Sequence, residues 1–63
     1  MQPYQQRVVE EKTELDNKLE KLGQFLEAET FSKLTEDEAR RLNNQFVVMT
    51  NYSHILGERI AAF

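Results

Sequence analysis

Apolar residues recur at alternating intervals of four and three along two segments of this chain, and this spacing constrains its fold more than any other feature. Such intervals place the apolar side chains on one face of an α-helix, as in a coiled-coil seam. In the first segment the seam consists of Val8, Leu15, Leu19, Leu22 and Leu26. Because Pro3 suits the first turn of a helix, and Gly23 is tolerated inside one, the spacing predicts a helix over about residues 3–27.

A capping motif, TEDE, marks the start of the second segment. The Thr35 hydroxyl can accept from the backbone N–H of Glu38, and the Glu38 carboxylate can reach back to the N–H of Thr35. We therefore predict a second helix from residue 36 to about residue 61. We expect Phe31 and Leu34, in the connection, to close one end of the core, with at most a single helical turn there. The second seam consists of Leu42, Phe46, Met49, Ser53, Leu56 and Ile60, and it can extend to Phe63.

The chain is too short to bury a large core by itself. Its 63 residues form one domain, 1–63, and contain no cysteine that could cross-link it. The second segment carries a further apolar stripe that one partner helix would leave uncovered. It consists of Val48, Tyr52, Ile55 and Ala62, with Gln45 and Arg59 in line. Scattered surface apolar residues would also explain this stripe. We predict an all-α fold, an antiparallel helical hairpin that assembles into a homo-oligomeric bundle, either a dimer or a tetramer.

Several classes of function are not supported by the composition. The net charge is −3 with both signs interspersed, which does not favour binding of a nucleic acid polymer. No apolar run approaches the roughly 20 residues of a membrane span, so we expect a soluble intracellular protein. Without cysteine and with the single His54, no metal-ligand spacing occurs, and no cofactor motif or catalytic set is present. We expect a protein that is not an enzyme and needs no cofactor.

Polar residues interrupt both seams near the two chain ends. A short connection makes the helices antiparallel, and pairing Leu22 with Leu42 then brings Lys12 beside Tyr52 and Ser53. This register gathers a polar layer near the termini. Its candidate ligand-binding residues are Tyr4, Arg7, Glu11, Lys12, Tyr52 and Arg59.

This layer has two interpretations. Polar residues in a seam can fix register and oligomer number, with Glu11 paired to Arg7 or Arg59 and Lys12 reaching out to solvent. Alternatively, the layer is a pocket for an anionic planar ligand. Guanidinium groups bind phosphates in a bidentate manner, and tyrosine rings stack on bases.

Two stretches, QQRVVEEKTELDNKLEKLGQFL and MTNYSHILGERI, resemble a family of very small phage proteins related to a hypothetical protein of a crAss-like phage. The similarity covers nearly the whole chain. It is carried by Gln6, Arg7, Val8, Glu11, Lys12, Glu14 and Leu15, by Lys21, Leu22 and Phe25, and by Met49, Tyr52, Ile55, Leu56, Arg59 and Ile60.

The resemblance implies a phage origin and action in the cytoplasm of an infected bacterium. Small helical phage proteins of similar architecture sequester nucleotide signals of defence systems such as CBASS and Thoeris. By that similarity, we expect sequestration of a cyclic oligonucleotide or an ADP-ribose-derived signal without catalysis. Arg7, Lys12 and Arg59 would then hold phosphates. The alternatives are a helical inhibitor or adaptor that binds a host protein, and a structural phage accessory protein.

Overall fold

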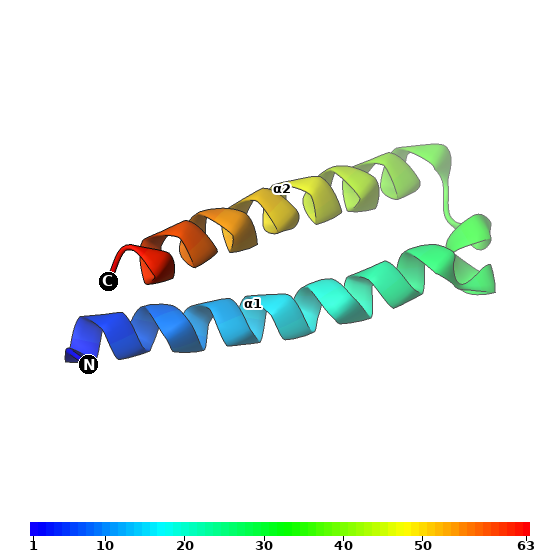
Figure 1. Ribbon diagram of the computed structural model, residues 1–63. Helices are drawn as coiled ribbons and strands as arrows, with labels where there is room; N and C mark the ends of the chain where they lie inside the picture. The colour runs from blue at the N-terminus through cyan, green and yellow to red at the C-terminus, as the bar shows by residue number, and fades with distance from the viewer.

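The computed structural model describes all 63 residues as two antiparallel helices and a short connection (Figure 1). Helix α1 runs over Pro3–Glu27, the 3-10 helix η1 over Glu29–Lys33, and helix α2 over Glu36–Ala61. The predicted all-α hairpin and both helix ranges are therefore confirmed. Assembly of hairpins into an oligomer remains a prediction at this point.

The start of each helix is capped by a local side chain. At α1, Pro3 occupies the first turn and the Gln5 side chain accepts from the backbone N–H of Gln2 at 2.8 Å. At α2, Thr35 Oγ1 accepts from the backbone N–H of Glu38 at 3.1 Å, as predicted. The predicted reciprocal bond was wrong. The Glu38 carboxylate instead accepts from the Arg41 guanidinium at 3.0 Å, because that cationic donor lies one turn further along the helix.

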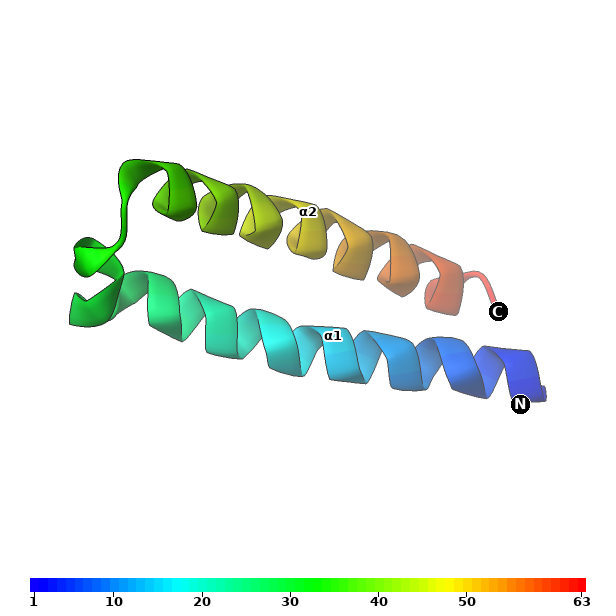
Figure 2. The ribbon, with the colours of Figure 1, turned by 180° about the vertical axis from the view of Figure 1, so that it is seen from behind.

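The two helices lie closest near the chain termini and diverge toward the connection (Figures 1 and 2). Three residues are buried within the chain: Val8, Ser53 and Leu56, the last with 0% of its surface exposed. All three lie in the half of the hairpin that contains both chain termini, which we call the terminal half. Gly57 of α2 lies next to Lys12 of α1 in this half. A Cβ atom added to Gly57 would lie 3.4 Å from Lys12 Cε, which is a contact distance to a flexible side chain of α1.

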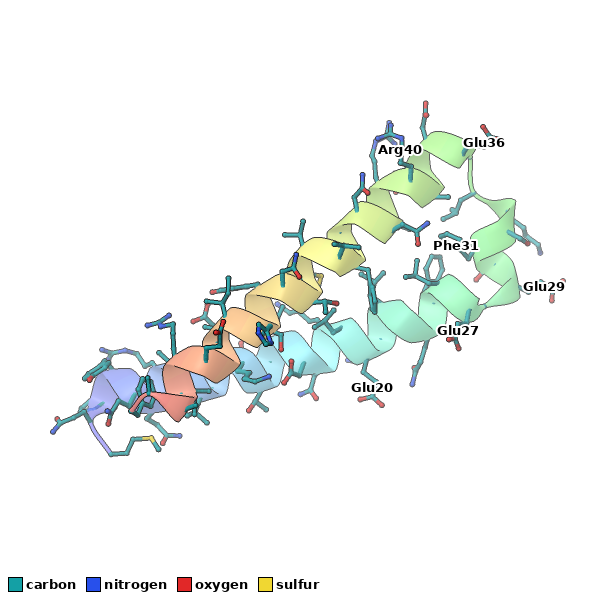
Figure 3. All side chains as sticks on the ribbon, turned by 45° about the horizontal axis from the view of Figure 1, so that its top comes forward. Glu20, Glu27, Glu29, Phe31, Glu36 and Arg40 are labelled. Carbon is teal, nitrogen blue, oxygen red and sulfur yellow. The ribbon has the colours of Figure 1, made fainter.

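Aromatic side chains fill the wider end of the hairpin. Phe31 of η1 points between the helices (Figure 3) and packs edge-on against Phe25, with ring centroids 6.2 Å apart. Phe46 lies across Gly23, where an added Cβ would be 3.5 Å from the ring. Phe31 and Leu34 are half-buried. The prediction that they close one end of the core is confirmed.

The hairpin is long and thin. Its extents are 45 × 15 × 13 Å and its radius of gyration is 14.5 Å, whereas a compact domain of this length has a radius of about 11 Å. Most seam residues are consequently only half-buried, since each is covered by one neighbouring helix. Neither helix is long and apolar enough to cross a membrane.

We expect Leu56→Ala to lower the free energy of unfolding by about 2–5 kcal/mol, because it leaves a cavity at a fully buried position. The control is His54→Ala, whose side chain is 77% exposed. This control should change stability by less than about 0.5 kcal/mol. Chemical denaturation at one fixed protein concentration measures both values. Equal losses for the two variants would show that the described packing of α2 is wrong.

Candidate ligand-binding site

A three-residue cluster joins the helices in the middle of the terminal half. Lys12 Nζ donates to Asp16 Oδ2 and to Ser53 Oγ, each at 2.9 Å. The Ser53 hydroxyl in turn donates to Asp16 Oδ1. Ser53 is a buried polar residue in the α2 seam, and such a hydroxyl needs hydrogen-bond partners. The cluster supplies them from α1, so it fixes the register between the helices.

The cluster also sets the ionisation of Asp16. The hydrogen bond from Ser53 lowers the pKa of the Asp16 carboxyl below its ordinary value of 3.8, and the hydrogen bond from Lys12 lowers the pKa further. Partial burial opposes both effects. The cluster therefore favours the ionised carboxylate of Asp16, which forms a salt bridge with Lys12 at 2.9 Å.

A second polar contact joins the helices beside the first. The Tyr52 hydroxyl donates to Glu11 Oε2. Glu11 and Lys12 are consecutive, so their side chains leave α1 about 100° apart. The two contacts therefore lie on different sides of the helix interface. The prediction that Lys12 lies beside Ser53 is confirmed, and Glu11 meets Tyr52 in the same layer.

Two arginines near the termini have no partner within the hairpin. Arg7 and Arg59 are both exposed, and neither forms a hydrogen bond or salt bridge in the chain, which pairs its other arginines with Asp37 and Glu38. The predicted pairing of Glu11 with one of them is wrong for the single hairpin, because Tyr52 occupies that carboxylate. Both guanidinium groups keep their donors free.

Tyr4, the remaining predicted residue, forms an aromatic pair. Its ring meets Phe63 edge-on, with centroids 6.0 Å apart. This contact ties the two chain ends together, in agreement with the adjacent termini in Figure 1. Tyr4 is still 54% exposed, so its ring retains a face that another molecule can cover.

Asp16 was missed by the sequence reasoning. Two signals point to it: Asp16 follows Lys12 by four residues, a spacing at which opposite charges meet on a helix, and Ser53 at a seam position needs a partner from α1. The structure shows both at once, because one carboxylate serves Lys12 and Ser53.

The single hairpin has no enclosed cavity at the candidate site. Its one surface depression lies elsewhere, on the outward face of α1, between Asn17, Glu20, Lys21 and Gln24, with no apolar lining. Glu20 points away from α2 in Figure 3. A ligand held by the terminal residues would therefore need a further surface to enclose it.

We expect the stabilising effect of Asp16 to depend on pH. A carboxyl whose pKa is lowered by folding stabilises the fold above its unfolded pKa, and this stabilisation is lost as pH falls through the lowered value. The difference in unfolding free energy between wild type and Asp16→Asn should be full above about pH 5 and should close as pH falls below 3.8. Denaturation at a series of pH values measures it.

Glu14→Gln is the control for this series, because Glu14 is exposed and forms no side-chain hydrogen bond. Its difference from wild type should stay small across the same range. If the difference in unfolding free energy between wild type and Asp16→Asn did not change with pH, the described cluster would be contradicted.

Comparison with known proteins gives two matches. The model of the Sequestin family matches residues 2–62. A 7.5 kDa protein from the denB–rIIB intergenic region of Enterobacteria phage T4 is 40% identical over 63 residues, which are 100% of this chain and 98% of that protein. No solved structure matches the chain. The resemblance to small phage proteins is confirmed, while the relation to a crAss-like phage stays a prediction. The chain belongs to the Sequestin family and is related over its whole length to a small phage protein.

Proposed function

We propose that this protein binds and sequesters a small anionic nucleotide that signals in bacterial defence, and that it does so without catalysis. The name of the Sequestin family suggests sequestration, and the phage T4 relative fits action in the cytoplasm of an infected bacterium. Cyclic oligonucleotides and ADP-ribose-derived signals, of the CBASS and Thoeris type, are the ligand classes that we propose.

The two unpaired guanidinium groups carry this proposal. Arg7 and Arg59 come from opposite helices and lie near the same end of the hairpin, where each is exposed and without an acidic partner. A guanidinium presents several donors in one plane, which suits the oxygens of a phosphate. Both groups keep their donors free for such an anion, because neither is paired with a carboxylate of the chain.

Aromatic rings at the same end would bind the planar parts of the ligand. Tyr4 is 54% exposed and Tyr52 is 41% exposed, and base stacking on an aromatic ring contributes about 1–3 kcal/mol. Glu11 holds the Tyr52 hydroxyl, which limits rotation of the ring before the ligand arrives. The Glu11 carboxylate has a second oxygen that can accept from a base or ribose.

We propose a different role for Lys12 than for the two arginines. Its ammonium already bonds Asp16 and Ser53, so a phosphate would compete with Asp16 for it. We propose that Lys12 adds positive charge to the site while holding the helix register. Since the single hairpin has no cavity at this end, we place the ligand at an interface between protomers.

Exposed apolar residues on α2, among them Val47, Val48 and Ile55, favour binding to another protein as the second candidate function. On that alternative the protein is an inhibitor or adaptor that acts on a host protein, and no nucleotide binds.

Calorimetric titration with cyclic dinucleotides, cyclic trinucleotides and cyclic ADP-ribose-derived compounds tests the proposal. We expect at least one compound to bind wild-type protein with a Kd below about 10 µM. Arg7→Ala and Arg59→Ala should each weaken that binding by about 1.5–3 kcal/mol, or roughly ten- to a hundredfold, since each removes a charge-assisted contact. Tyr52→Ala should lose about 1–3 kcal/mol of stacking.

Arg40→Ala is the matched control, because Arg40 is 63% exposed and approaches only Asp37, at 3.7 Å. Figure 3 shows it at the connection end of α2, far from the termini. This variant should bind like wild type. If no compound binds wild-type protein, the nucleotide proposal fails in favour of a protein partner. If wild type and both arginine variants bound the compound equally well, Arg7 and Arg59 would not be part of the binding site.

A further inference from the structure

Helix α2 carries a second apolar seam that α1 does not cover. Val48, Tyr52 and Ile55 follow the four-and-three spacing, and they are 65%, 41% and 51% exposed. By helical geometry their mean direction is about 115° from that of the inner seam, which packs against α1. The line continues to Gln45 on one side and Arg59 on the other. This outer seam has the periodicity of a helix-packing face rather than of scattered surface residues.

The shape of the hairpin shows why this face needs a partner. The chain consists of two long helices and a short connection, so no third helix covers the outer seam. Only three residues of 63 are buried. The outward face of α1 is polar, with Asn17, Lys21 and Gln24 among its residues. The surface for a further hydrophobic contact therefore lies on α2 and not on α1.

We propose that two copies of this chain associate through their outer seams, with the two α2 helices antiparallel and a two-fold axis near Tyr52. In this register Val48 packs against the partner's Ile55, and Ile55 packs against the partner's Val48. A two-fold axis requires that if one residue contacts a second residue of the partner, the second contacts the partner's copy of the first. The pairs of Val48 with Ile55 and of Tyr52 with itself satisfy this requirement. The inference rests on α2 and on the shape of the hairpin, and it holds whether or not the ligand is a nucleotide.

Charge favours the antiparallel arrangement over the parallel one. A parallel pair in register would place Arg59 against the partner's Arg59, and Arg41, at the other end of the same line, against the partner's Arg41. Like charges directly opposed in this way are destabilising. The antiparallel pair sets Arg59 near the partner's Gln45, whose amide can accept from a guanidinium. Opposed helix dipoles favour the same arrangement.

Tyr52 is held in place for this contact before association. Its hydroxyl is bonded to Glu11 of the same hairpin, so less rotational freedom is lost when the partner covers one side of the ring and leaves the other side for the proposed ligand. The terminal part of α2, including Arg59, then lies beside the middle of the partner's α2. The candidate ligand site would be bounded by both copies, which gives it the wall that the single hairpin lacks.

Sedimentation of Val48→Asp against Val47→Asp tests the surface. The two valines are adjacent in sequence and similarly exposed, at 65% and 56%, but their side chains leave the helix about 100° apart. Wild type and Val47→Asp should sediment at twice the 7.4 kDa chain mass. Val48→Asp should raise the dissociation constant at least about tenfold, because it places a carboxylate in an apolar contact. Equal dissociation constants for the two variants would overturn the assigned face.

Cysteine cross-linking tests the direction of packing on folded protein, and the native chain has no cysteine to interfere. Within one helix, positions 48 and 55 lie about 10 Å apart, too far for a disulfide. The double variant Val48→Cys/Ile55→Cys should oxidise to a covalent dimer, while each single variant should stay monomeric on a denaturing gel. Covalent dimers from both single variants would show parallel packing and overturn the antiparallel arrangement. A wild-type protein that sediments as a folded monomer at micromolar concentration would overturn the proposal as a whole.

Discussion

The buried hydroxyl of Ser53 determines how the two helices meet. It lies in a seam otherwise built of apolar residues, and its partners, Lys12 and Asp16, both belong to α1. A shift of either helix by one turn would break both hydrogen bonds that this hydroxyl forms with α1. An all-leucine seam would impose no such restriction. The polar layer therefore selects one register, and the positions of Tyr52, Leu56 and Arg59 relative to α1 follow from it.

The same layer divides the residues of the terminal half by role. Lys12 and Asp16 satisfy each other and Ser53, and Glu11 holds Tyr52, so these side chains serve the contact between the helices. Arg7 and Arg59 are exposed and form no hydrogen bond or salt bridge inside the chain. Under the proposed function, these two guanidinium groups would bind an anion outside the chain. The two interpretations of the polar layer are compatible, because different residues would carry them.

The bounds of both helices could be predicted because their signals are local. Pro3, the Thr35 cap and the four-and-three spacing each act within one or two turns. The register could also be predicted, since one pairing of leucines fixes all others in an antiparallel hairpin. The Glu38–Arg41 pair and the Tyr4–Phe63 contact could not be predicted. Each depends on which of several nearby donors or rings a flexible side chain reaches, and sequence spacing does not rank those choices.

Mass spectrometry of small molecules released by heating the purified protein tests the central claim most directly. The protein would be isolated from bacteria in which a nucleotide-based defence system has been activated. We expect a phosphate-bearing nucleotide to be released from the wild-type protein in a fixed ratio to the chain. A variant with both Arg7→Ala and Arg59→Ala, purified in parallel, should release far less. Wild-type protein that is folded and releases no nucleotide from such cells would contradict a role in sequestration.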